Sequence, residues 1–209
     1  MKQVLIAHQS AIPHYRVPFY NALERLRPPD WRFDVVFDHR ECRSPLFFSE
    51  PIDASRFDFS TLDVRTISAR IGGKRIAYQN FWRRAGGYDL VIVEDAFNNL
   101  TYPLCHIHRL HGTRLALWGH GRDMNATRRT LLKSAAERVK LLLSRSADAF
   151  FAYTPGVAEY LLDRGVASGR VFTVYNTIDI EEQRQAYEKW RPQRDKIRRH
   201  LGLADKNVL

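Results

Sequence analysis

Short runs of apolar residues recur along the chain, and most are followed by a longer segment with a mixed, helix-like pattern. The runs LVIVE and AFFAY are apolar at nearly every position and rich in β-branched and aromatic residues. Such runs are typical of strands that are covered on both faces of a sheet. The expected strands are residues 3–7, 33–37, 64–67, 90–94, 114–118, 149–153 and 171–174.

Between these strands the pattern indicates helices. They are expected at residues 18–26, 74–84, 100–110, 128–144 and 156–164. Strand–helix alternation of this kind predicts parallel βαβ units. We therefore expect an α/β fold, a Rossmann-like, doubly wound and mostly parallel sheet of about seven strands with helices on both faces. Residues 38–63 are the least regular and are expected to contain a surface loop.

Composition narrows the class of protein. With 209 residues, of which 44% are hydrophobic, the chain can bury a substantial core. Its two cysteines, Cys42 and Cys105, do not make a disulfide framework, which favours a reducing compartment. The opening MKQVLIAHQS is too short for a signal peptide, and no later apolar segment reaches a membrane-spanning length. We expect a cytoplasmic protein, either soluble or peripheral at the inner face of the membrane.

The charge indicates the kind of partner. A formal net charge of +10 favours an anionic one, such as nucleic acid, anionic lipid or a phosphate-bearing substrate. Nucleic acid is disfavoured, because the basic residues are not interleaved with exposed aromatic residues and no recognition motif is present. An anionic membrane and a phosphate-bearing substrate both remain.

The segment after the first expected strand, HQSAIPHYRVPFYNAL, leads into a helix. Pro18 fits the first turn, where a missing N–H costs nothing. His14, Tyr15 and Arg16 therefore lie at the positive end of the helix dipole, where free N–H groups and the arginine can bind phosphate. The alternative is an ordinary helix start with a surface arginine. The sequence has no GxGxxG, so a dinucleotide fingerprint is absent.

The stretch RLALWGHGRD passes from a buried strand into a loop of small and charged residues. Parallel sheets bind ligands beyond the carboxyl ends of their strands, so His120 stands at a favourable position. Gly119 and Gly121 would let backbone and imidazole approach a ligand, and Arg122 would add charge at the rim. An ordinary tight turn is the alternative.

Two further strand ends carry polar residues. Glu94 and Asp95 are adjacent, so in extended backbone their side chains point to opposite sides and do not form an acid–base pair. Asn176 and Thr177 follow the last expected strand. Asn176 is either a turn residue or a group that points into the same crevice as His120.

The segment CHIHRLHG could be read as a metal site, because it carries Cys105, His108 and His111 on one expected helix. At 100° per residue these three side chains spread over about 120° of helix surface, which is too wide for one compact zinc site without outside ligands. We expect an exposed helical face here and no metal.

Residues 128–144, RRTLLKSAAERVKLLLS, are typical of a basic amphipathic helix. Arg128, Arg129 and Lys133 are among its basic residues. Its apolar face consists of Leu131, Leu132, Ala135, Val139 and Leu142. Such a helix can lie on an anionic membrane, or it can pack its apolar face on the core and leave the other face in solvent. The pattern alone leaves both interpretations open.

The order of these motifs resembles that of a known family. WGHGRD is followed by SRSADAFFAYTPGVAEYLLDRGV, then RVFTVYNTID, then a charged stretch that ends in IRRHLGL. This order resembles the N-terminal half of bacterial retaining glycosyltransferases of the GT-B fold, the large glycosyltransferase group 1 or family 4. The resemblance covers essentially the whole chain, and residues 147–179 carry its most specific part. Thr177 stands where the family pattern has glycine.

The resemblance implies a two-domain enzyme. Residues 1–180 would form the acceptor-side, Rossmann-like domain, and residues 181–209 a charged linker to a donor-binding domain that this sequence does not contain. By position, His120 matches the histidine that faces the donor sugar and is the expected catalytic residue, while Asn176 matches an asparagine near the interdomain cleft. The segment 14–16 replaces a Gly-Gly loop under the donor diphosphate. The expected substrate-binding residues are His14, Tyr15, Arg16, Gly119, Gly121, Arg122, Asn176 and Thr177.

The resemblance also implies the reaction. A sugar would move with retention from a nucleotide-sugar to a saccharide or lipid-linked acceptor, in bacterial polysaccharide or glycolipid biosynthesis. N–H groups, a helix dipole and arginine can stabilise the diphosphate leaving group, so no metal or other cofactor is expected. Arg128, Arg129 and Lys133 would suit an acceptor at a membrane surface. The alternative is a non-catalytic module that binds an anionic membrane or a polyanion through the basic helix.

Overall fold

A computed structural model describes residues 1–8, 12–40, 53–121, 131–175, 180–203 and 206 of the chain. The chain divides into two compact units, Met1–Asn176 and Thr177–Leu209. The predicted boundary near residue 180 lies close to this division, and the roles assigned to the two parts stay predictions. The second unit contains the helices α6 (Ile180–Trp190) and α7 (Arg194–His200).

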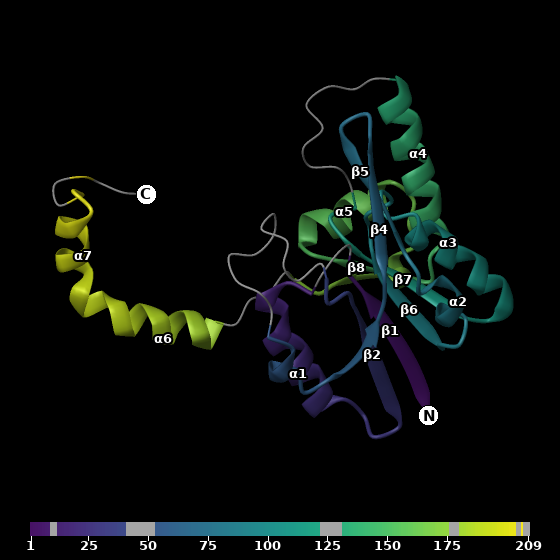
Figure 1. Cartoon of the computed structure of the whole chain (residues 1–209). Coiled ribbons are helices and arrows are strands. Elements are labelled where there is room, and N and C mark those ends of the chain that lie inside the picture. Colours follow the sequence, from purple (N-terminus) through teal and green to yellow (C-terminus); the bar gives the residue numbers. More distant parts are fainter. Residues whose placement is uncertain (9–11, 41–52, 122–130, 176–179, 204–205, 207–209) are drawn as a thin grey trace. The chain divides into compact units, whose positions relative to one another are not determined.

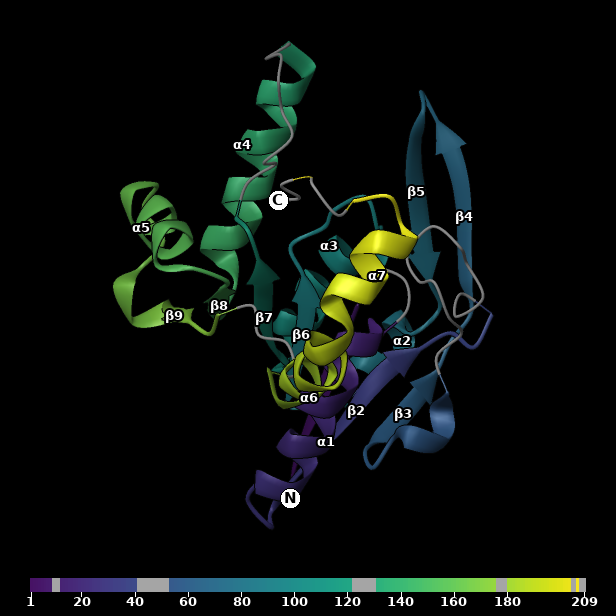
Figure 2. The same cartoon turned by 90° about the vertical axis from the view of Figure 1, so that its left-hand side faces the viewer.

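The first unit is built on a parallel sheet. Within the described residues, seven strands pair in the order β3-β2-β1-β6-β7-β8-β9, and every pairing is parallel. Figure 2 labels β9, β8, β7, β6, β2 and β3 in this order across the sheet. The strands are β1 (Lys2–Ala7), β2 (Trp31–Phe37), β3 (Ser60–Asp63), β6 (Leu90–Glu94), β7 (Arg114–Gly119), β8 (Ala149–Ala152) and β9 (Val171–Thr173). The predicted doubly wound α/β fold is confirmed.

Helices cover both faces of the sheet (Figure 1). On one face lies α1 (Val17–Leu26), and on the other lie α2 (Trp82–Ala85), α3 (Thr101–His108) and α5 (Pro155–Asp163). The longest described helix is α4 (Leu131–Ser146), which leads into β8. None of the described helices is long and apolar enough to cross a membrane.

The core forms two layers because successive strand side chains point to opposite faces. In β2, Val35 and Phe37 pack on the α1 side with Tyr20, while Val36 between them joins the cluster under α2, α3 and α5. All four side chains are essentially inaccessible to solvent. This burial on both faces is the reason that the strand sequences are continuous apolar runs.

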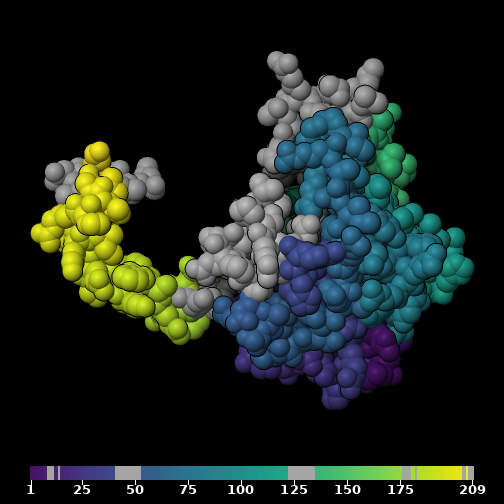
Figure 3. All heavy atoms as spheres, in the orientation of Figure 1, coloured from purple at the N-terminus to yellow at the C-terminus, as the bar shows by residue number. Residues whose placement is uncertain are grey.

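The predicted helix at residues 74–84 is wrong. The chain there forms β5 (Lys74–Gln79), which pairs with β4 (Thr66–Ile71) in an antiparallel hairpin, and only the short α2 follows. Gly72 and Gly73 make the turn with φ of 58° and 76°, the left-handed pair that a two-residue hairpin turn requires. The predicted strand at 64–67 covers the two residues that connect β3 to β4 and the first two residues of β4. In the space-filling view the hairpin, in blue, stands at the surface (Figure 3).

Asp148 ties three elements together just before β8. Its carboxylate accepts hydrogen bonds from Nε and Nη2 of Arg109 at 2.8 and 3.0 Å, and from the backbone N of Leu115 at 2.8 Å. Burial alone would raise the pKa of Asp148, but these hydrogen bonds outweigh it and hold the pKa below its usual value. The ionised carboxylate therefore stabilises the fold.

Replacing Asp148 with asparagine should lower the free energy of unfolding by about 1 to 2 kcal/mol at pH 7, since charged hydrogen bonds are lost. Because the folded-state pKa is lowered, this contribution is present above about pH 4 and is lost as the pH falls through the folded-state value. Urea denaturation at a series of pH values measures both effects. Asp163→Asn, at an exposed position of α5, is the control, and a D148N variant as stable as wild type at pH 7 would contradict the assignment.

Candidate active site at the carboxyl ends of the strands

Four neighbouring strands of the first unit end in polar residues at one edge of the sheet. His8 follows β1, Glu94 ends β6, His120 follows β7 and Tyr153 follows β8. The strand order reverses between β1 and β6, so the connections on the two sides leave the edge in opposite directions. In open α/β sheets ligands bind beyond the carboxyl ends at such a switch point.

The surface hollows that are found elsewhere in the described chain do not lie at the carboxyl ends of the strands. One is lined by Gln3, Arg27 and Asp34, and another by Lys2 and Arg114, among others. Both lie along the amino-terminal halves of the strands. The carboxyl edge is therefore the better candidate, since parallel sheets bind ligands there.

Two glycines pack against the core where β7 ends, one as its last residue and one just after His120. Gly119 has φ 149°, and a Cβ there would lie 3.1 Å from Cβ of Asp95. Gly121 has φ 67°, and a Cβ there would lie 3.3 Å from Cδ2 of Leu161. Both glycines are buried, whereas His120 between them is exposed. The two glycines thus hold the backbone on either side of His120 against the core and leave the imidazole at the surface.

His120 and Arg16, which the sequence places far apart, meet around Tyr153. The His120 ring lies 5.0 Å from the Tyr153 ring and nearly perpendicular to it, at 83°. The Arg16 guanidinium lies 5.6 Å from the centroid of the same tyrosine and 5.2 Å from that of Trp118. The two predicted site residues therefore belong to one cluster at the carboxyl edge.

Arg16 is not the surface arginine of an ordinary helix start. It stands at the N-cap of α1, with Pro18 in the first turn as expected, and only 3% of it is exposed. The rings of Tyr15 and Phe19 also lie within 6 Å of its guanidinium, at 5.7 and 5.9 Å. Aromatic faces attract a cation, and the attraction is stronger where water is excluded. The positive charge is thus held in place behind the exposed Tyr15.

A buried hydrogen-bonded chain that sequence reasoning missed runs beside this cluster. Nδ1 of His8 lies 2.8 Å from Oε1 of Glu94, and Nε2 of His8 lies 2.5 Å from the hydroxyl of Tyr20. His8 and Tyr20 are buried, while the side chain of Glu94 is 22% exposed. The His8 ring also contacts Trp118 at 5.0 Å. The hydrogen bond from the buried His8 thus holds Glu94 at the same edge of the sheet as His120.

Asp95 points to the opposite face from Glu94, as the alternation of the strand predicts. Its side chain is 1% exposed, and Nζ of Lys140 from α4 lies 2.9 Å from its Oδ2. Burial raises the pKa of the Asp95 carboxyl to about 6, and Lys140 offsets only part of that effect. Asp95 therefore links the end of β6 to α4 rather than facing the site.

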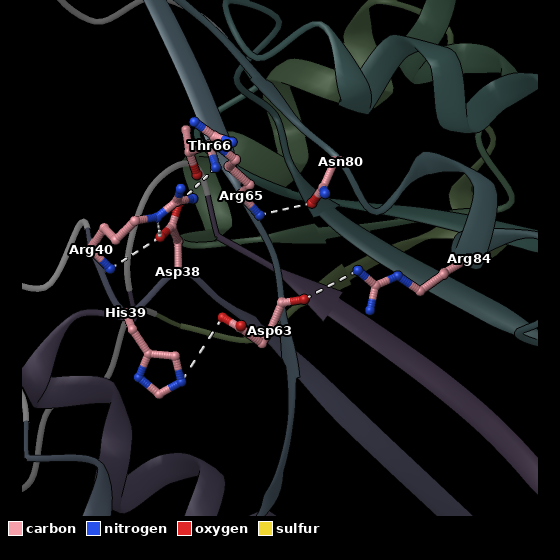
Figure 4. Close-up of polar contacts among 8 residues, drawn as sticks. All are labelled: Asp38, His39, Arg40, Asp63, Arg65, Thr66, Asn80 and Arg84. Carbon is pink, nitrogen blue, oxygen red and sulfur yellow. Dashed lines mark hydrogen bonds and ion pairs between the residues drawn. The ribbon is translucent and has the colours of Figure 1, made fainter.

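The edge beyond β2 is closed by its own polar contacts (Figure 4). The buried Asp38 carboxylate accepts from Nε and Nη2 of Arg40 at 3.0 and 2.9 Å, and from the backbone N of Thr66 at 2.6 Å. Burial would raise the pKa of Asp38, but these hydrogen bonds lower it overall. Nearby, Arg84 donates to the backbone O of Asp63 at 3.2 Å. These groups fix the start of β4.

Other predicted residues are placed differently or are not described. Cys105 is buried, and His108 donates from Nε2 to the backbone O of Trp82 at 2.7 Å, so both take part in packing α3. Among the described residues no group of histidine, cysteine or carboxylate side chains could hold a metal ion. Arg122, Arg128, Arg129, Asn176 and Thr177 lie outside the described residues, as do the side chains of His14 and Lys133.

Comparison with known families gives a direct result. Residues 20–182 match the family model of Glycosyltransferase Family 4. The chain belongs to this family. The resemblance predicted from the sequence is confirmed for family and fold, which is that of the N-terminal domain of a GT-B glycosyltransferase. Among curated proteins, none matches the sequence at a significant level.

Solved structures share the fold at low sequence identity. HepE of Anabaena, in complex with UDP and glucose, is 14% identical with a TM-score of 0.55, covering 98% of this chain and 51% of that one. UDP-GlcNAc 2-epimerase of Neisseria meningitidis, bound to UDP-GlcNAc, is 16% identical with a TM-score of 0.51, covering 100% and 54%. A putative UDP-N-acetylglucosamine 2-epimerase of Listeria monocytogenes is 17% identical with a TM-score of 0.51, covering 82% and 45%. The chain thus spans about half the length of these structures.

The raised pKa of Asp95 predicts a carboxyl titration with a midpoint near 6, measurable by NMR of its carboxyl carbon. Folding then takes up a proton between about pH 4 and 6, so stability decreases by on the order of 2 kcal/mol as the pH rises through this range. Asp95→Asn should lack that decrease. Asp89 is the control, because a hydrogen bond from the backbone of Gln3 lowers its pKa and its shift therefore has the opposite sign. An Asp95 midpoint near 4 would contradict the burial argument.

Proposed function

We propose that this chain supplies the acceptor-side half of a retaining glycosyltransferase, which moves a sugar from a nucleotide-sugar to a saccharide or lipid-linked acceptor in bacterial polysaccharide or glycolipid biosynthesis. The observation that carries the proposal is the exposed His120 on a glycine-fixed loop, beside Arg16 and Tyr153, in a chain of Glycosyltransferase Family 4. A residue of this kind at a carboxyl strand end is well placed to meet a sugar.

The solved structures with the same fold favour a nucleotide-sugar as the donor. HepE is seen with UDP and glucose, and the Neisseria epimerase with UDP-GlcNAc. These proteins are about twice as long as this chain, so the second half of the site is expected from a further domain. The charged segment 181–209 would lead to that domain.

The chemistry of transfer suits the groups at this edge. The leaving diphosphate gathers negative charge, which helix N–H groups and a positive side chain can stabilise without a metal. Arg16 at the N-terminus of α1 supplies a fixed positive charge. His120 would hydrogen-bond a sugar hydroxyl and orient the reacting sugar.

His120→Ala in the full-length protein should lower the transfer rate about a hundredfold, as expected when one donor to the reacting sugar is lost. A panel of UDP-, GDP- and ADP-sugars with release of nucleotide as readout identifies the donor. His111→Ala, an exposed histidine of the 3-10 helix Arg109–His111, is the control. Unchanged transfer by H120A would exclude the assigned role.

Product analysis separates this proposal from epimerisation, the activity named for two of the structural neighbours. The anomeric proton of the product, followed by NMR, should show a new glycosidic bond of the same configuration as the donor. A nucleotide-sugar inverted at C2, with no acceptor consumed, would replace the proposal with an epimerase.

A second proposal, peripheral contact with an anionic membrane, is favoured by the outward face of α4. Val139 and Leu142, expected to pack or to meet lipid, are 55% and 61% exposed. By helical geometry the exposed Arg138 stands on the same side of the helix as Leu142, whereas Arg145 donates from Nε and Nη2 to the backbone O of Arg164. An exposed apolar pair beside a basic side chain suits a helix that lies at a lipid interface.

Replacing Val139 and Leu142 together with serine should reduce co-sedimentation of the full-length protein with phosphatidylglycerol vesicles severalfold, because apolar area at the interface is lost. Arg128→Glu, Arg129→Glu and Lys133→Glu in combination should do the same and should abolish the preference over phosphatidylcholine. Leu162→Ser, at a 41% exposed leucine of α5, is the control. Sedimentation that none of these changes affects would exclude membrane contact through α4.

A further inference from the structure

The two hydrogen bonds that join Tyr20, His8 and Glu94 run in one direction, from the donor Tyr20 to the acceptor Glu94. Burial raises the pKa of Tyr20 well above its usual value, so the hydroxyl keeps its proton. A buried hydroxyl proton needs an acceptor, and the neighbour within hydrogen-bonding distance is Nε2 of His8. With Nε2 accepting, the imidazole proton sits on Nδ1 and is donated to Oε1 of Glu94.

These hydrogen bonds use one oxygen of the Glu94 carboxylate and leave the other for another partner. The hydrogen bond from His8 goes to Oε1, and within the described part of the chain no hydrogen bond to Oε2 is formed. Glu94 pairs with Trp118 in register at the very end of β6, and its side chain keeps 22% of its surface exposed. The exposed part of the Glu94 side chain therefore lies at the carboxyl edge, in the candidate site.

The charges at this edge indicate what such an oxygen would bind. The Arg16 guanidinium lies 5.6 Å from the centroid of the Tyr153 ring. Burial raises the pKa of Tyr153, the negative charge of Glu94 raises it further, and the positive charge of Arg16 opposes both. A carboxylate accepts hydrogen bonds from hydroxyls and repels phosphate, whereas a guanidinium favours phosphate. The uncharged, hydroxyl-bearing part of a substrate fits Glu94, and the anionic part fits the Arg16 side.

We propose that Glu94 binds a hydroxyl of the acceptor saccharide, and that His8 and Tyr20 are positioning residues that hold its carboxylate toward the site. This assignment rests on the proposed function, in which the present domain supplies the acceptor side. It adds a substrate contact on β6 to the residues around His120.

The direction of the hydrogen bonds that join Tyr20, His8 and Glu94 can be tested without an activity assay. Nitrogen chemical shifts of His8 in full-length protein labelled with [15N]histidine should show Nδ1 protonated and Nε2 unprotonated, and Tyr20→Phe should shift the Nε2 resonance as its donor is lost. A proton on Nε2 in the wild-type protein would overturn the assigned direction of the chain.

Saccharide binding tests the role of Glu94. Methyl glycosides of glucose, galactose, mannose and N-acetylglucosamine are titrated into the full-length protein by NMR, with UDP titrated separately. At least one glycoside should bind, and Glu94→Gln should weaken it about tenfold to a hundredfold while leaving UDP affinity unchanged, since a charged hydrogen-bond acceptor is lost. Tyr20→Phe should weaken it less, by about threefold. Glu159→Gln, at an exposed position of α5, is the control.

The outcomes separate this assignment from the proposed function. Failure of every nucleotide-sugar to react, with glycoside binding still lost in E94Q, would sink the transferase proposal and leave the saccharide contact standing. Unchanged glycoside affinity in folded E94Q, no glycoside binding by wild type, or loss of UDP affinity alone would each overturn the role of Glu94.

Discussion

In the part of the chain that the structure describes, all seven strands of the main sheet run in one direction, and this single constraint decides where functional side chains can meet. Parallel strands bring their carboxyl ends to one edge, however far apart those ends lie in sequence. His8, Glu94, His120 and Tyr153 come from four different strand ends and meet there because β1, β6, β7 and β8 are neighbours. The strand order reverses between β1 and β6, and open α/β sheets bind ligands at such a switch point.

Because side chains alternate between the two faces at the end of β6, the adjacent carboxylates of Glu94 and Asp95 have different surroundings. Glu94 turns to the α1 side, where His8 holds it next to the site, and Asp95 turns to the other side, where Lys140 pairs with it in the core. Gly119 has no side chain because Asp95 lies against it. The structural carboxylate thus fixes the loop that presents His120, and the partly exposed one is left to meet a ligand.

The strands could be predicted because burial on both faces requires continuous apolar runs, as in β6 and β8. The hairpin at residues 66–79 could not, because KRIAYQ has no strict alternation and its basic residues suit a helix surface equally well. The Gly72-Gly73 pair was the signal for a two-residue turn. Long-range pairing decided the outcome: the backbone of β5 bonds to Asn98 and Leu100, which no local pattern reveals.

The site could be predicted only in part, because it also depends on contacts between residues that are distant in the sequence. His120 and Arg16 stand out because a strand end and a helix start are visible in the sequence. Their meeting around Tyr153 depends on packing between elements distant in the chain. The bond from His8 to Glu94 spans 86 positions, and His8 follows an apolar strand without any motif around it. Burial of polar residues is a property of the fold and leaves no local trace.

Hydrogen–deuterium exchange of the full-length protein, with and without a nucleotide-sugar and its acceptor, tests most directly whether the carboxyl edge is the site. We expect exchange to slow in the peptides that contain His120 and Tyr153, and in the peptide that contains Glu94. Peptides from the opposite edge, around Lys2, Asp89 and Arg114, should be unaffected. Protection confined to that opposite edge, with His120 and Tyr153 unchanged, would contradict the placement of the site.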